Sequence, residues 1–103
     1  MTESQLLRIR SLISELMGIH PSDKVRIGRI TNELVLLIDQ ILSNSPTDSV
    51  EAALGDILDE LRRSQYYVFS DVVSKSRHSI KINDLIQRTR FRRLQDRLKR
   101  FRT

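Results

Sequence analysis

The densest group of side chains that could do acid–base chemistry is a carboxylate cluster in the middle of the chain, formed by Asp56, Asp59 and Glu60. Asp56 and Glu60 are four residues apart, so a helix places them on one face, where two carboxylates can bind a metal ion or act as acid and base. A solvated helix face has the same spacing, and we interpret the cluster as such a face. His20 and His78 are far apart in the sequence, and we expect both to be surface side chains.

The residues that other catalytic and metal-binding frameworks need are missing. The chain has 103 residues and no cysteine, so zinc sites, iron–sulfur sites and disulfide frameworks of the usual kinds are excluded. No G-x-S-x-G motif occurs, and the three glycines, Gly18, Gly28 and Gly55, are too far apart to form a phosphate-binding loop. We therefore predict a protein that is not an enzyme, with no catalytic residue, metal ligand, cofactor or small-molecule substrate.

Positive charge is concentrated at the C-terminal end. Residues 1–73 carry seven basic and eleven acidic side chains, net −4, whereas residues 74–103 carry eleven basic and two acidic ones, net +9. Such a compact cationic segment predicts DNA, another polyanion or an acidic protein surface as its partner. The predicted binding residues are the eight basic side chains at the end of the chain: Arg88, Arg90, Arg92, Arg93, Arg97, Lys99, Arg100 and Arg102.

Helices are the elements that must position these side chains, and the first two are easily recognised. Thr2 begins a capping-box spacing, apolar residues then recur every three or four positions, and the helix is expected to stop near Met17. Gly18 fits the left-handed residue that closes a last helical turn. A second apolar stripe predicts a helix that ends near Asn44. We expect it to start later than Lys24, because Gly28 inside its first turns costs about 1 kcal/mol relative to alanine.

A third helix of about 26 to 28 residues, roughly 40 Å long, is predicted over residues 50–75. Only Gly55 and no proline interrupts it, and Thr47 or Asp48 can cap it. A helix this long exceeds what a monomeric core of this size covers, so its apolar stripe predicts a homo- or heterodimer. The stripe, and the predicted dimer interface, consists of Leu54, Ile57, Leu61, Val68 and Val72.

The segment after this helix changes its pattern twice. Residues 80–82 alternate apolar, basic and apolar like a very short strand, and a short helix is expected from Asn83 or Asp84. Further apolar residues follow at helical spacing, and we expect Phe91, Leu94 and Leu98 to anchor the basic helix to the body of the protein. The predicted class is therefore all-α, in a single domain.

One short motif has a family resemblance. Between Arg77 and Ile86 the order is Arg, any residue, Ser, Ile, three residues, Asp and two aliphatics. This resembles the second loop and third-helix start of the histone fold, and the resemblance implies that Arg77 pairs with Asp84 as a structural clamp. A carboxylate at a helix N-terminus meets the positive end of the helix dipole, and a guanidinium can bind it through two hydrogen bonds.

The resemblance maps a histone-fold-like core onto residues 30–91, about 60% of the chain. A long central helix is flanked there by shorter helices, with an extra helix in residues 1–20 and a basic extension in residues 92–103. The mapping looks most like the small TBP-associated factors of transcription complexes. It implies a dimerising subunit that helps assemble a transcription or chromatin complex, nuclear in a eukaryote. The first loop lacks the basic residue that nucleosomal histones place near DNA.

Two alternatives remain open. Residues 82–89 and 92–101 could form a helix-turn-helix in a homodimeric DNA-binding regulator, with the turn at Arg90 and Phe91. The chain could instead be a helical adaptor that binds proteins and no nucleic acid. In every case we expect an intracellular protein without a membrane partner, because the longest apolar run, Leu34 to Ile38, is far too short to span a bilayer and no secretory signal is apparent.

Overall fold

Five α-helices make up residues 2–101, the part of the chain that the computed structural model describes. The prediction of an all-α fold is confirmed. The helices are α1 (Thr2–Gly18), α2 (Lys24–Ser43), α3 (Asp48–Ser64), α4 (Tyr66–Lys75) and α5 (Ser79–Phe101).

Capping residues determine where α2 and α3 begin. Asp23 and Thr47 each accept a hydrogen bond, through a side-chain oxygen, from the backbone N–H three residues later, which satisfies one of the unpaired donors of a first helical turn. The prediction that Gly18 adopts a left-handed conformation at the end of α1 is wrong, because no glycine has a positive φ within residues 2–101. Ser45, just before Pro46, is the described residue that adopts one, at 49°.

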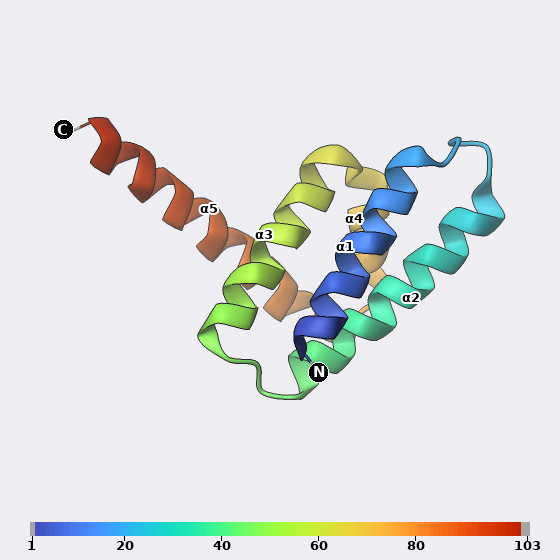
Figure 1. Ribbon diagram of the computed structural model, residues 1–103, viewed down its shortest axis with the longest axis horizontal. Coiled ribbons are helices and arrows are strands. Elements are labelled where there is room, and N and C mark those ends of the chain that lie inside the picture. The colour runs from blue at the N-terminus through green and yellow to red at the C-terminus, as the bar shows by residue number, and fades with distance from the viewer. Residues whose placement is uncertain (1, 102–103) are drawn as a thin grey trace.

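The first four helices pack as a ring around one apolar core. Helix α1 contacts α2 and α3, and α4 contacts the same two helices from the other side. Helix α5 packs on α3 and α4. Figure 1 shows α4 behind α1 and the end of α5 extending away from the other helices. A hydrogen-bonded ion pair of 2.9 Å between Arg8 and Glu33 joins α1 to α2 and raises the pKa of the Arg8 guanidinium.

The predicted continuous helix over residues 50–75 is wrong, because the backbone leaves the helical conformation at Gln65 (φ −141°, ψ 75°). Ser64 donates its hydroxyl hydrogen to the backbone oxygen of Glu60, a back-bond that bends helices. Gln65 Nε2 donates to the backbone oxygen of Leu16, 3.2 Å away at the end of α1. Tertiary contact, rather than glycine or proline, therefore divides the stretch, and α4 packs against α3 and α2.

The break also overturns the predicted dimer interface. Its residues face the interior of the chain itself, and none is more than 1% exposed. They cannot contact a partner in this conformation, because α1, α2, α4 and α5 already cover them. The residues wrongly predicted to form the dimer interface are Leu54, Ile57, Leu61, Val68 and Val72.

Helix α5 differs from the prediction at both ends. It begins at Ser79, so the predicted strand at residues 80–82 is wrong, and it continues without a break to Phe101. The predicted helix-turn-helix is wrong for the same reason, since residues 90 and 91 lie inside one helix. Ile82, Leu85 and Ile86 are buried at helical spacing, which explains why the helix starts early. Within residues 2–101, no helix has the length and apolar character needed to cross a membrane.

Candidate binding interface

The first half of α5 attaches the helix to α3 at a point of very close approach. Thr89 is 3% exposed and lies over Gly55 of α3, where a Cβ would overlap the Thr89 hydroxyl oxygen. Glycine is therefore required at residue 55 to let the two helix backbones come together.

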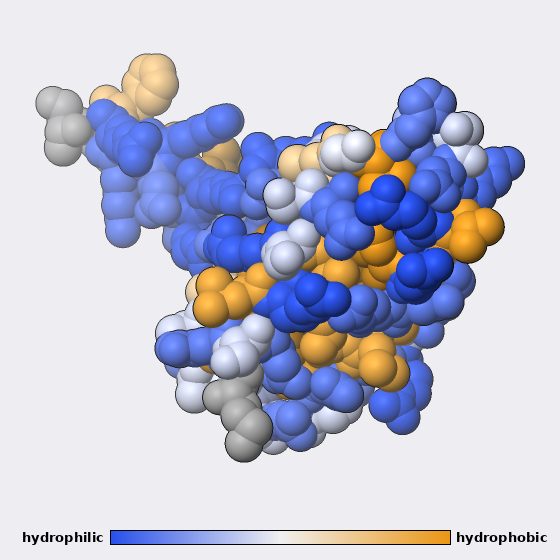
Figure 2. Space-filling model, turned by 45° about the vertical axis from the view of Figure 1, so that its right-hand side comes forward, coloured by the Kyte–Doolittle hydropathy of each residue, from blue (hydrophilic) through white to orange (hydrophobic). Residues whose placement is uncertain are grey.

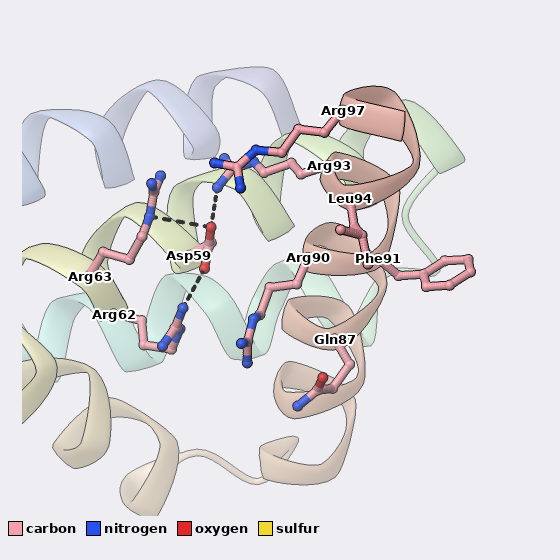
Figure 3. Close-up of a pocket in the computed structure, with 9 residues that line it drawn as sticks. All are labelled: Asp59, Arg62, Arg63, Gln87, Arg90, Phe91, Arg93, Leu94 and Arg97. Carbon is pink, nitrogen blue, oxygen red and sulfur yellow. Dashed lines mark hydrogen bonds and ion pairs between the residues drawn. The ribbon is translucent and has the colours of Figure 1, made fainter. Parts of the chain in front are cut away.

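A buried carboxylate lies next to this crossing. Asp59 of α3 is 2% exposed, and its oxygens contact Arg62 at 3.1 Å, Arg63 at 3.4 Å and the guanidinium of Arg93 on α5 (Figure 3). The interpretation of this carboxylate as part of a solvated face is wrong. Burying an isolated carboxylate costs desolvation free energy, and the attraction of three guanidinium groups can offset that cost.

Asp56 of α3 also contacts arginines of α5, from a more exposed position than Asp59. Its carboxylate lies 2.7 Å from Arg92 and 3.3 Å from Arg93. Glu60 is exposed, as expected. Within residues 2–101, no three His, Cys, Asp or Glu side chains are arranged to hold a metal ion. Asp56 and Asp59, two of the three carboxylates in the cluster, hold α5 against α3 through their ion pairs with Arg92 and Arg93.

The eight predicted binding residues divide into two groups. Three are tied to α3: Arg92 and Arg93 as above, and Arg88 by Glu51 at 3.5 Å. Arg88 also lies 3.0 Å from Asp84 within α5. Four others are exposed on α5: Arg90, Arg97, Lys99 and Arg100. The eighth, Arg102, lies outside the described residues.

An open hollow of about 450 Å³ between α3 and α5 brings arginines of both helices together. Arginines are five of its nine lining residues: Arg62, Arg63, Arg90, Arg93 and Arg97. Asp59 is the one carboxylate in this lining, so the hollow is strongly positive. Figure 3 shows the arginine side chains reaching from both helices into the same space. Sequence reasoning missed Arg62 and Arg63, although their spacing of three and four residues from Asp59 is the spacing of helical ion pairs.

The second half of α5, residues 91–101, is called the arm here. Figures 1 and 2 show it projecting from the body, and the molecule measures 49 × 30 × 23 Å. The expected anchoring role of Phe91, Leu94 and Leu98 is wrong, because these side chains, like that of Phe101, are more than half exposed. At about 100° per residue, they lie on the side of the helix opposite Ile82 and Ile86, which make the contact with the body.

The predicted clamp between Arg77 and Asp84 is also wrong. Arg77 Nε lies 3.8 Å from Asp39, which also accepts a hydrogen bond from Ser76. Asp84 lies 3.0 Å from Arg88, one turn further along α5. Because α5 begins at Ser79, Asp84 is inside the helix and is not placed to cap its first turn.

We expect Arg77→Ala and Asp84→Ala to act independently. Both side chains are well exposed, at 80% and 60%, so each change should cost less than about 1 kcal/mol of unfolding free energy. The double variant should match the sum of the single variants to within about 0.5 kcal/mol in urea denaturation. A coupling free energy above about 1 kcal/mol between the two changes would instead show that Arg77 and Asp84 pair directly.

Comparison of the chain with protein-family models, with curated proteins and with solved structures gave no match.

Proposed function

We propose that the chain is a non-enzymatic subunit of a transcription or chromatin complex, nuclear in a eukaryote, that contacts the phosphates of a nucleic acid with the arginines of α3 and α5. The observation that carries this proposal is the hollow lined by five arginines. A planar guanidinium can bind a phosphate through two parallel hydrogen bonds, so such a cluster suits a phosphate backbone. Phosphate contacts position a protein on nucleic acid without reading its sequence.

Hydrogen-bonding capacity in the hollow is incompletely used. Arg62 has a buried Nε without a hydrogen-bond partner. Arg90 and Arg97 are exposed and have no ion pair with any residue in 2–101. A phosphate entering the hollow would meet the exposed guanidinium groups of Arg90 and Arg97 first, while Asp59 keeps Arg93 in place.

The assembly part of the proposal rests on the histone-fold resemblance. In chain order α3 and α4 stand between α2 and α5, and the resemblance assigns the long central helix to this stretch. Leu61 and Val68 are seven residues apart, so the heptad spacing of apolar residues continues in the sequence from one side of Gln65 to the other.

Duplex DNA titrated with the full chain tests the proposal. We expect binding at low salt that changes little with sequence and weakens steeply as salt rises, with a logarithmic slope of about −0.9 per phosphate contacted. Arg90→Gln with Arg97→Gln should flatten that slope by about 2 units if each contacts one phosphate. Fluorescence anisotropy of a labelled duplex measures both quantities.

A matched control removes the same charge elsewhere. Arg10→Gln with Arg29→Gln changes two exposed arginines on α1 and α2, helices that do not touch α5, and should leave the slope nearly unchanged. If the control flattens the slope equally, binding reflects net charge and not the hollow. If the wild-type chain shows no binding at low salt, the second candidate function, a protein-binding adaptor, takes its place; the exposed apolar residues of the arm favour that candidate.

A further inference from the structure

The apolar residues of the arm have the spacing of a coiled-coil seam. Phe91, Leu94, Leu98 and Phe101 follow one another at intervals of three, four and three, which are the intervals between a and d positions of a heptad. They span about 15 Å of helix in an arc of about 80°. We call these four residues the seam. Their exposed fractions are 61%, 52%, 54% and 92%, so the body leaves the seam uncovered.

The positions that flank the seam are basic. With Phe91 at position a, Arg90 and Arg97 occupy g, and Arg88 and Gln95 occupy e. Residues at e and g form the ion pairs that select the partner of a coiled coil. No acidic residue is present at any of these four positions. The acidic side chain of the arm, Asp96, lies at f, away from the seam.

We propose that the seam packs against an acidic amphipathic helix of a different protein, whose apolar a and d residues cover Phe91 to Phe101 and whose Glu or Asp side chains pair with Arg90 and Arg97. The two arginines are exposed and have no ionic partner in the described chain. Burying four large apolar side chains supplies the affinity, and the opposite charges select the partner.

Two other occupants fit the seam less well. A second copy would place Arg90 and Arg97 against the arginines of the first in an antiparallel pair, and like charges facing each other at short range oppose association. A lipid surface suits a helix with a wide apolar face, whereas the seam is as narrow as a coiled-coil contact. Charge and width therefore both favour an acidic helix.

The experiment uses the full chain and a defined probe. The probe is a labelled peptide of three heptads with Ile at a, Leu at d and Glu at e and g, and the counter-probe has Lys in place of every Glu. We expect the chain to bind the Glu peptide and to bind the Lys peptide at least about tenfold more weakly. Fluorescence anisotropy gives both dissociation constants.

Three double variants separate the contributions. Leu98→Ser with Phe101→Ser keeps every charge and should weaken binding of the Glu peptide by about tenfold or more. Arg90→Gln with Arg97→Gln should weaken it by about fivefold. Lys99→Gln with Arg100→Gln removes the same charge away from the seam and should change it by less than about twofold. Circular dichroism should show equal helix content in all three, because the altered side chains are exposed.

The inference shares Arg90 and Arg97 with the proposed nucleic-acid contact, and the seam variant distinguishes the two. Leu98→Ser with Phe101→Ser should leave the salt-dependent binding of duplex DNA unchanged, because neither residue lines the hollow, so either proposal can fail alone. Equal binding of the two peptides, or no binding of the Glu peptide, overturns the inference. Self-association in sedimentation that the seam variant abolishes would assign the seam to a second copy. Seam-dependent binding to phosphatidylserine–phosphatidylcholine vesicles without binding of the Glu peptide would assign it to lipid.

Discussion

Asp59→Asn should lower the unfolding free energy by about 2 to 3 kcal/mol. The carboxylate is almost fully buried, and its removal leaves three guanidinium groups close together without their shared counter-charge. Breaking a fully buried ion pair costs about 3 to 5 kcal/mol. We expect less here because Arg62, Arg63 and Arg93 keep 27%, 60% and 39% of their side-chain surface exposed, so water can reach them.

The neighbouring residue provides the control for this prediction. Glu60→Gln removes one negative charge from an exposed position of the same helix and should cost less than about 0.5 kcal/mol. Urea denaturation gives both values, and hydrogen exchange of residues 88–101 should report faster local opening of α5 in Asp59→Asn. A loss as small as that of the control would mean that Asp59 does not hold α5.

Gly55→Ala is expected to destabilise the protein by about 1 to 2 kcal/mol, although alanine is the better helix former. The gain in helix propensity is about 1 kcal/mol. Overpacking at the crossing of α3 and α5 opposes that gain, because the added Cβ overlaps the Thr89 hydroxyl oxygen and also meets the backbone oxygen of Leu85 at 3.5 Å. Overpacking of a closed contact costs about 1 to 3 kcal/mol. We expect the upper part of that range, about 2 to 3 kcal/mol, because the helices must separate, and subtracting the gain of about 1 kcal/mol leaves a net loss of about 1 to 2 kcal/mol.

A glycine in open space and a second-site change test this explanation. Gly28 lies inside α2 with nothing within 4 Å of an added Cβ, so Gly28→Ala should stabilise by about 0.5 to 1 kcal/mol. Thr89→Ala removes the overlapping hydroxyl and should recover most of the loss when combined with Gly55→Ala. Thermal denaturation of the wild type and of the four variants measures these differences. Additive effects of the changes at residues 55 and 89 would show that the overlap is not the cause.

Helix formation in the N-terminal half could be predicted from the sequence because its signals are local. The side chains of Asp23 and Thr47 act on backbone groups three residues away, and the apolar period of α1 and α2 requires only that some core exists. The excess of positive charge after residue 74 is likewise a property of composition. None of these features depends on which other segment lies nearby.

The break at Gln65, the early start of α5 and the partners of Asp59 needed the tertiary structure. Nothing in the residues next to Gln65 forbids a helix, and its side chain bonds to a backbone oxygen 49 positions earlier in the chain. Once α4 turns back, the apolar stripe predicted to face a partner closes over the chain's own core. Composition and periodicity determined that this chain is helical, apolar along its stripes and basic at its end. Which stripe is buried and which is exposed was decided by packing, because a helical pattern specifies a face but not the surface that the face meets.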